Sequence, residues 1–381
     1  MQLTLIHLNI KMKMPNKITY ITYQTFPANT ANSLQTISNI KYIIKNGVKV
    51  DLIFPLRSTQ SSDSLEEINK YYGENLDFQI RGTEHKYPFG RFKFFNKFSF
   101  LISHYLWSKN ITKNIDYSDN ENYFFTRSDW VFYFLSKREM TVVFECHQYT
   151  KIRKILINKS LKNENSKVIF LNENLKSDYE QKYNLNNNYL VLQNGVDIDL
   201  FKKIIKKKNQ LIFVGKLTRF GKSRNIDFLL RSFSKLDNSY YLKIIGASEL
   251  ELKNYNQIIR DLQISDRVEI IEYLPHKEVV KLVCESEVGI LINSNVNAHS
   301  SKYTSPLKYF EYLCADSKVV ATEFSAHKIL PFSENISFYN LDNENSFVSA
   351  VLDSKHNSLL TQNEKERISL NNRVKEIINL F

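Results

Sequence analysis

The chain has 381 residues, which is the length of two ordinary globular domains. Hydrophobic residues make up 43% and charged residues 24%, so a mostly disordered chain, a collagen-like chain and a polytopic membrane protein are excluded. The net charge of +12 predicts an anionic partner: nucleic acid, a nucleotide or a negatively charged membrane surface. Three cysteines without CxxC spacing predict neither a disulfide framework nor a zinc site, and a reducing cytosol fits best.

The first residues resemble neither a membrane anchor nor a signal peptide. Residues 3–10 are apolar but too few to span a bilayer, and they lack the basic start and the cleavage site of a signal peptide. Met14 opens a more typical beginning, so we expect residues 1–13 to be a disordered extension or an artefact of start-codon choice. No run of 18 apolar residues occurs, which predicts a soluble or peripheral protein.

Short apolar runs alternate with longer amphipathic stretches in two series. In the first, strands are expected at residues 18–22, 49–54, 123–126, 141–145, 167–171 and 189–193, with a helix at 33–44. In the second, strands are expected at residues 211–214, 241–245, 268–271, 288–292 and 318–321, with helices at 225–236, 249–263, 277–285 and 305–315. This alternation indicates parallel sheets covered on both faces. We predict an α/β fold with two Rossmann-like domains, residues 14–196 and 197–381, that face a central cleft, the last helix packing back on the first domain.

The turn after the strand at residues 211–214 carries candidate phosphate ligands. Functional loops of such sheets lie at the carboxyl ends of the strands. Here Gly215 lets the backbone turn sharply, and Lys216 together with Lys222 or Arg224 could grip a diphosphate. A turn with solvated lysines is the alternative interpretation.

A second motif, SKYTSPLKYFEYL, predicts the start of a helix at an anion. Ser305 and Pro306 suit the N-cap and first helical positions, so the backbone N–H groups of Leu307 and Lys308 would face the anion. Glu311 follows one and a half turns later, where its carboxylate could accept hydrogen bonds from the two hydroxyls of a ribose. An ordinary capped helix with a surface glutamate would give the same pattern.

Five segments stand in the order and spacing of a known family. They are VLQNGVDIDLF (191–201), FVGKL (213–217), RNIDFLL (224–230), DRVEIIEYLP (266–275) and YTSPLKYFEYL (303–313). The sequence resembles the nucleotide-sugar-dependent glycosyltransferases of family 4, strongly over residues 189–330 and more loosely over 16–188. The resemblance implies a GT-B fold and a retaining enzyme without a metal or other cofactor. It would move a sugar from a nucleotide-diphosphate sugar to a saccharide or lipid-linked acceptor in cell-surface polysaccharide biosynthesis.

The resemblance also implies roles for individual residues. Lys216 and Arg224 would stabilise the departing diphosphate, with Lys222 as a competitor for the second position, and Glu311 would bind the ribose. Tyr303 stands where the family often has a glutamate near the donor sugar, which leaves a non-catalytic partner of another transferase, or a nucleotide-sugar epimerase, as alternatives. Further donor contacts are expected from Gly215, Pro275, Ser305, Pro306 and Leu307.

Polar residues also follow strands of the first series. Asn29 and Thr30, in the loop after the first strand, are candidate contacts to donor or acceptor, or else an N-capping cluster. Arg127 ends the third strand, and His147 lies just past the fourth. In related enzymes a histidine in this loop lies near the reacting sugar, so we expect a catalytic role for His147 and a sugar contact for Arg127, with structural roles as the alternative.

Residues 81–113 carry seven Lys or Arg against one acid, interleaved with nine aromatic residues. Such a segment suits the boundary of an anionic membrane, where aromatic rings enter the headgroup region and lysines face the lipid. It also suits a single-stranded nucleic-acid platform, but no RNA-binding motif accompanies it, and we expect no nucleic-acid partner. Core aromatics with solvated lysines are the remaining alternative. We therefore expect a cytoplasmic protein that attaches peripherally to the inner face of the cell membrane.

Overall fold

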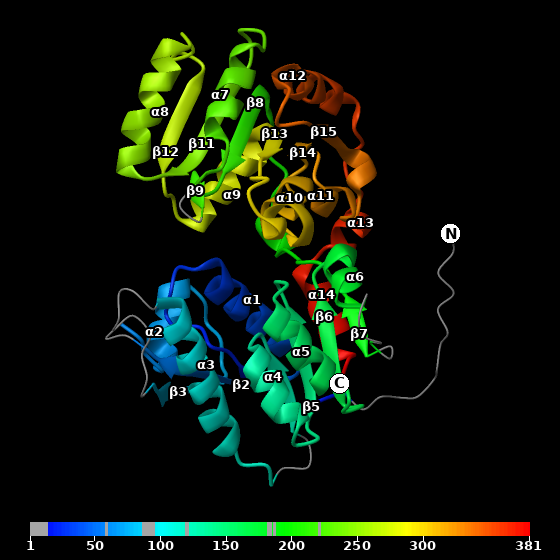
Figure 1. Ribbon diagram of the computed structural model, residues 1–381. Helices are drawn as coiled ribbons and strands as arrows, with labels where there is room; N and C mark the ends of the chain where they lie inside the picture. Colours follow the sequence, from blue (N-terminus) through cyan, green and yellow to red (C-terminus); the bar gives the residue numbers. More distant parts are fainter. Residues whose placement is uncertain are drawn as a thin grey trace.

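The protein folds into two lobes, each built on one parallel sheet (Figure 1). The computed structural model describes residues 14–57, 60–85, 96–118, 122–180, 185, 188–219 and 222–381. Residues 1–13, the expected extension, lie outside the described residues. The predicted α/β fold with two Rossmann-like sheets is confirmed.

The first sheet has seven strands in the order β3-β2-β1-β4-β5-β6-β7, and every neighbouring pair is parallel. Its strands are β1 (Lys17–Ile21), β2 (Lys49–Leu56), β3 (Gln79–Glu84), β4 (Tyr123–Thr126), β5 (Thr141–Cys146), β6 (Ser166–Phe170) and β7 (Tyr189–Val191). Its helices are α1 (Ala31–Lys45), α2 (Leu65–Tyr72), α3 (Asn96–Lys113), α4 (Asp129–Ser136), α5 (Lys151–Ser160) and α6 (Glu173–Glu180). Neighbouring strand residues point into different cores, since Phe125 packs with Tyr20 while Phe124 packs with Trp107. Both faces are therefore buried, as the continuous apolar strands predict.

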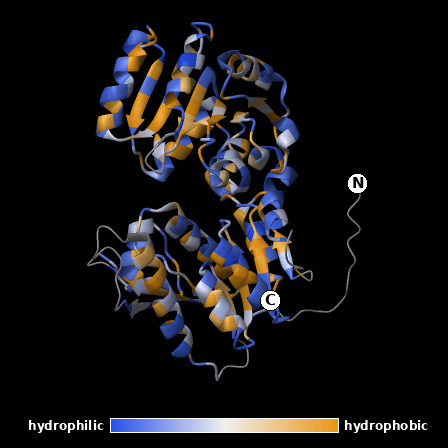
Figure 2. Cartoon of the chain, in the orientation of Figure 1, coloured by the Kyte–Doolittle hydropathy of each residue, from blue (hydrophilic) through white to orange (hydrophobic). Residues whose placement is uncertain are grey.

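The second sheet repeats this topology with six strands in the order β12-β11-β8-β13-β14-β15. Its strands are β8 (Lys207–Val214), β11 (Tyr241–Ala247), β12 (Val268–Glu272), β13 (Ser286–Leu291), β14 (Lys318–Thr322) and β15 (Ile336–Tyr339), and a short hairpin joins β9 (Thr218–Arg219) to β10 (Lys222–Ser223). Its helices are α7 (Ile226–Ser234), α8 (Glu249–Asp261), α9 (His276–Glu285), α10 (Leu307–Cys314), α11 (Ser325–Lys328) and α12 (Glu344–Asp353). Apolar strands lie inside and polar helix faces outside (Figure 2).

The end of the chain returns to the first lobe through α13 (Gln362–Arg367) and α14 (Leu370–Ile378) (Figure 1). α14 packs against α1, and its side chains Val374 and Ile377 join the core beneath the first sheet. The Leu370 N–H donates to the Val196 carbonyl at 2.7 Å, so the two chain crossings between the lobes lie side by side. None of the helices in the described part of the chain has the length and hydropathy needed to cross a bilayer.

Candidate active site

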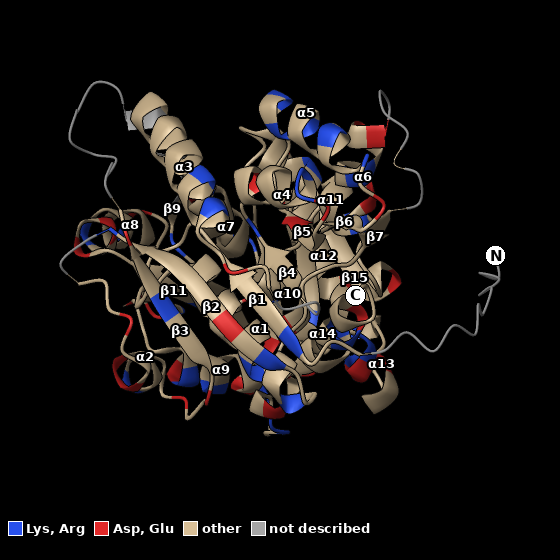
Figure 3. Ribbon diagram, turned by 90° about the horizontal axis from the view of Figure 1, so that it is seen from below, with Lys and Arg blue, Asp and Glu red and all other residues tan. Residues whose placement is uncertain are grey.

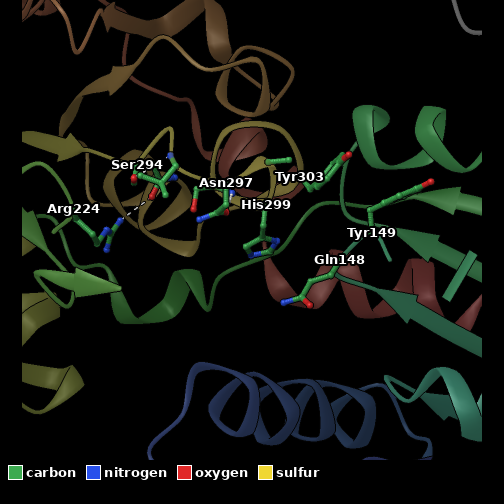
Figure 4. A pocket seen from close by; sticks show the side chains of 11 residues that line it. Gln148, Tyr149, Arg224, Ser294, Asn297, His299 and Tyr303 are labelled. Atoms are coloured by element: carbon green, nitrogen blue, oxygen red, sulfur yellow. Dashed lines mark hydrogen bonds between the residues drawn. The ribbon is translucent and has the colours of Figure 1, made fainter. Parts of the chain in front are cut away.

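A cavity of about 520 Å³ lies between the two lobes at the ends of β5 and β13. Gln148 and Tyr149 line it from the first lobe, while Arg224 and the segment at residues 293–303 line it from the second (Figure 4). Both sheets reverse their strand order nearby, between β1 and β4 and between β8 and β13. Ligands of such sheets bind at these switch points, so the topology itself marks this cavity as the site.

Two glycines let the loops of the second lobe pack closely enough to place Arg224. Gly215 has φ +150°, and a Cβ there would come within 2.6 Å of the Arg224 guanidinium. Gly246 has φ +113°, and a Cβ there would meet the Gly215 carbonyl at 2.6 Å. Other residues rarely adopt these backbone angles, so the turn depends on glycine. The Arg224 side chain consequently crosses the end of β8 and reaches the cavity wall.

The structure describes the side chain of Lys216 but not that of Lys222. Lys216 is exposed, and no hydrogen bond or ion pair joins it to another described residue, so its charge is available to an anion. Lys222 begins β10, but its side chain lies outside the described residues. The competition between Lys222 and Arg224 for the second position therefore remains a prediction.

The helix expected to have Ser305 as its N-cap begins one residue later, with Pro306 as the N-cap and Leu307 as the first residue of α10. Ser305 is 4% exposed, and its hydroxyl accepts a hydrogen bond of 3.0 Å from the Asn194 N–H. The prediction that Ser305 caps the helix is wrong, because its hydroxyl is hydrogen-bonded to Asn194 in the segment that joins the two lobes. The backbone N–H groups at Leu307 still lie at the helix N-terminus, where a phosphate would be stabilised.

Glu311 is a buried carboxylate rather than a surface one, with 6% of the residue exposed. Lys308 Nζ lies 2.5 Å from one carboxylate oxygen, and His276 Nε2 lies 3.6 Å from the other. Burial raises the pKa of Glu311, but Lys308 and His276 outweigh this and bring the pKa to about 2. Glu311 is therefore ionised at neutral pH. Pro275, the exposed N-cap of α9, brings His276 beside it.

Tyr303, which stands where the family often has a glutamate, makes contacts with the first lobe. Its hydroxyl donates to the Asp178 carboxylate of α6, and its ring stacks on Tyr149 with centroids 6.2 Å apart. Lys302 Nζ also binds Asp178, at 2.8 Å. Asn172 adds hydrogen bonds to the carbonyls at 302 and 304. Residues 302–304 of the second lobe are thus hydrogen-bonded to Asn172 and Asp178 of the first lobe, beside the cavity.

His147 lies in a buried charge cluster next to the cavity. Its Nε2–H donates to the Glu145 carboxylate, which is fully buried, and its Nδ1 accepts from Arg127 Nη2 at 3.1 Å. Arg373 of α14 donates to the other Glu145 oxygen at 2.7 Å. Burial and Arg127 lower the pKa of His147 to about 4, so the ring is neutral at pH 7. Burial raises the pKa of Glu145, yet Arg373 and His147 hold it well below its usual range.

Arg127, Asn29 and Thr30 have partners in the protein. The Arg127 side chain is 7% exposed and also donates to Asn32 Oδ1 at 3.1 Å, so it orients the His147 loop more than it faces the cleft. Thr30 is the N-cap of α1 and accepts the Ser33 N–H, which is the alternative that the sequence left open. Asn29 bonds the Tyr273 hydroxyl of the other lobe at 2.8 Å.

Sequence reasoning missed most of the residues that line the cavity, Asn293 and His299 among them, and it also missed Glu145 and Arg373 of the buried cluster. Asn293 directly follows an expected strand, so its position at a carboxyl end was a usable signal. Glu145 reads as part of a buried strand, and nothing in the local sequence links it to Arg373, which lies 228 residues further along the chain. Within the described ranges, no group of three or more His, Cys, Asp or Glu side chains is arranged to hold a metal ion.

Comparison with known proteins agrees with this geometry. Residues 197–321 match the family model described as glycosyl transferases group 1. Sucrose-phosphate synthase from Thermosynechococcus elongatus is 13% identical, with a TM-score of 0.69 over 96% of this chain and 98% of that one. A glycosyltransferase from Rickettsia africae is 16% identical, with a TM-score of 0.65 and the same coverage. HepE from Anabaena, in complex with UDP, is 10% identical, with a TM-score of 0.63 over 95% and 98%. No curated protein matches this chain by sequence.

The family match identifies residues 197–321 as a domain of the glycosyl transferases group 1, and the solved glycosyltransferase structures share the two-lobed fold of the whole chain. The resemblance to glycosyltransferases that the sequence segments predict is confirmed for residues 197–321, which match the family model. The match covers the lobe that contains Gly215, Arg224 and Glu311, which are the residues expected to contact the donor.

Proposed function

We propose that the protein is a retaining glycosyltransferase that moves a sugar from a nucleoside diphosphate sugar to a saccharide or lipid-linked saccharide in polysaccharide assembly at the cell surface. The observation that carries the proposal is the interlobe cavity, which has Arg224 in one wall and Gln148 and Tyr149 of the other lobe in the opposite wall. A donor sugar in this cavity would contact both lobes, so transfer would require the whole cleft.

The donor would bind along the second lobe. The ionised Glu311 carboxylate would accept the two ribose hydroxyls, while Arg224, Lys216 and the N-terminus of α10 would stabilise the diphosphate. The structural neighbour HepE binds UDP, which supports a nucleoside diphosphate sugar as the donor and makes UDP the first nucleotide to test. No cofactor is required by this arrangement of donor contacts.

The chemistry would rely on the leaving group rather than on an enzymic base. None of the residues that line the cavity is a carboxylate, and His147 is already engaged with Glu145 and Arg127. His299 lines the cavity but is given no proton transfer in this mechanism. As the bond between the anomeric carbon and the phosphate oxygen breaks, the acceptor oxygen would bond to the same face of that carbon, and its proton would pass to the departing phosphate. Arg224 and Lys216 would stabilise the charge that develops there.

Tyr303 favours a second candidate function, a nucleotide-sugar-binding partner without turnover. Its hydroxyl is occupied by Asp178, so the cavity has no carboxylate at the position where the family often has one. The two functions differ in one result, because the non-catalytic partner would bind donor but form no glycosidic product with any acceptor. A same-fold epimerase would instead convert the nucleotide sugar without an acceptor.

Glu311→Gln tests the ribose contact. The variant keeps the shape of the side chain but loses the charge that the ribose hydroxyls would bind. We expect UDP to bind about tenfold more weakly, since a hydrogen bond to a charged group contributes about 1.5–3 kcal/mol. Isothermal titration calorimetry measures this, with the exposed Glu249→Gln of the same lobe as the control. Unchanged affinity in a folded Glu311→Gln protein would exclude the ribose role.

The acceptor membrane is expected to meet α3, α4 and α5, which lie together on one side of the first lobe (Figure 3). Large apolar side chains are exposed there: Phe98, Leu101 and Ile102 on α3, and Ile152 and Ile155 on α5. Between them, Tyr105 of α3 packs edge-on against Trp130 of α4. Lys and Arg residues also occur on α3 and α5 (Figure 3). Residues 86–95, the middle of the sequence segment that suggested membrane attachment, lie outside the described residues.

Vesicle co-sedimentation tests this attachment. Lys109 and Lys113 on α3 are exposed, and each cation near an anionic surface contributes about 1 kcal/mol. We expect the protein to sediment with vesicles that contain anionic lipid, less so in high salt, and Lys109→Glu with Lys113→Glu to weaken binding at least about tenfold. Lys253→Glu on α8 of the other lobe should change nothing. Failure of the wild type to bind anionic vesicles at low salt would refute the attachment, as would preferential binding of single-stranded RNA.

A further inference from the structure

Hydrogen-bonded polar side chains lead from Arg224 and Asn293, which both line the cavity, to the buried His327. Arg224 Nη2 donates to Asn293 Oδ1 and to the Ile292 carbonyl, both at 2.9 Å. Asn293 Nδ2 lies 3.2 Å from His327 Nε2, and His327 Nδ1 lies 2.8 Å from the Thr322 carbonyl. This chain of hydrogen bonds therefore runs from the cavity wall to the end of β14.

The hydrogen bonds permit only one arrangement of protons. A carbonyl oxygen can only accept, so Nδ1 of His327 must be the protonated nitrogen. Nε2 then carries a lone pair and accepts from the amide nitrogen of Asn293. The amide oxygen of Asn293 is consequently turned toward Arg224, the side on which a guanidinium needs an acceptor. His327 thus selects the orientation of Asn293, and Asn293 fixes one edge of the guanidinium.

Burial separates His327 from any ligand. Its side chain is 0% exposed and that of Asn293 is 2% exposed, whereas Arg224 and Asn293 contribute to the cavity wall. Burial also lowers the pKa of His327 to about 4, which keeps the ring in the neutral form that the chain of hydrogen bonds requires. No other part of the proposed mechanism uses this histidine.

We propose that His327 is a positioning residue that acts through Asn293 to hold Arg224 toward the diphosphate of the donor. The proposal rests on the donor role of Arg224 given above. An arginine side chain loses rotational freedom when it binds a phosphate, and a guanidinium held in advance by Asn293 has already lost it. The contact should therefore strengthen donor binding even though His327 never touches the donor.

A double-mutant cycle tests the proposal, with UDP as the probe and calorimetry as the readout. His327→Leu removes the acceptor for Asn293 and is expected to weaken UDP binding about tenfold, while His327→Gln, whose amide oxygen can occupy the place of Nε2, should restore most of it. In an Arg224→Ala background His327→Leu should have no further effect, because both changes remove the same contact. An equal loss of affinity in both backgrounds would overturn the proposal, as would no loss in either.

The outcomes separate this proposal from the one it rests on. If Arg224→Ala leaves UDP affinity unchanged, the donor role of Arg224 fails and the positioning role fails with it. If Arg224→Ala weakens binding but His327→Leu does not, only the positioning role is refuted. Ser286→Ala is the control for a lost buried hydrogen bond: Ser286 begins β13 at the opposite end of the sheet, where it bonds Gln210 at 2.9 Å. Should His327→Leu fail to fold, Asn293→Ala makes the same test one residue closer to Arg224.

Discussion

Arg224→Ala is expected to lower turnover by about 10²–10³-fold, which corresponds to about 2.7–4 kcal/mol of transition-state stabilisation, as for the loss of one donor from an oxyanion site. The guanidinium lies in the wall of the cavity and is held there by Asn293 and the Ile292 carbonyl. Arg224→Lys should restore only part of the rate, because an ammonium cannot make the same two contacts. The measurement is the rate of sugar transfer at saturating donor and acceptor.

Arg231→Ala provides the matched control, since Arg231 lies on α7 of the same lobe and pairs with Glu344 at the surface. Lys216→Ala should show a loss similar to that of Arg224→Ala, because its exposed charge is available to the diphosphate. If Lys222→Ala reduces turnover and Arg224→Ala does not, the phosphate contact comes from Lys222 of β10 rather than from Arg224.

Glu145→Gln is expected to reduce the free energy of unfolding by about 3–5 kcal/mol, the usual cost of removing one partner from a buried ion pair. Glu145 and Arg373 are both buried, and the substitution leaves the Arg373 charge without its counter-ion. Because Arg373 belongs to α14, the loss should also loosen the helix that returns to the first lobe. Chemical denaturation with a probe in each lobe measures both effects.

The pH dependence gives this second prediction a clear sign. The pKa of Glu145 is held well below its usual range, so its stabilising contribution is present above the unfolded pKa of about 4.3 and is lost as the pH falls toward the folded pKa. The difference between wild type and Glu145→Gln should therefore shrink in acid. Glu164→Gln, an exposed change in the same lobe, should alter stability by less than about 0.5 kcal/mol. A loss below about 1 kcal/mol for Glu145→Gln would contradict the role of the cluster.

Most of the fold could be predicted because each central strand is a continuous run of apolar residues that can be recognised in the sequence alone. Continuous runs such as residues 141–145 and 211–214 became β5 and β8, and the alternation with helices indicated two parallel sheets. β3 (Gln79–Glu84) and β15 (Ile336–Tyr339) were missed. Both are edge strands that are only partly buried, so the apolar pattern that marks the central strands is weaker there.

The site was predictable where the backbone alone positions a residue, and unpredictable where distant segments meet. Gly215 and Glu311 occur in local motifs, and the structure places Gly215 in a tight turn and Glu311 in a buried position, while their donor roles stay predictions. Ser305 was assigned to a cap because its local sequence suits one, but its hydroxyl is taken by Asn194, which lies 111 residues earlier in the chain. Tyr303 likewise depends on Asp178 of the other lobe. Such contacts between lobes leave no periodicity in the sequence.

The central claim is that the cleft binds a nucleoside diphosphate sugar through Arg224. Its most direct test is a thermal-shift titration of the wild-type protein against UDP-, GDP-, ADP- and dTDP-sugars. We predict that one of these donors raises the melting temperature in a saturable way, because a ligand that binds only the folded state stabilises it. We also predict that Arg224→Ala removes this shift. A protein whose melting temperature responds to none of the four donors at millimolar concentration would contradict the proposed function.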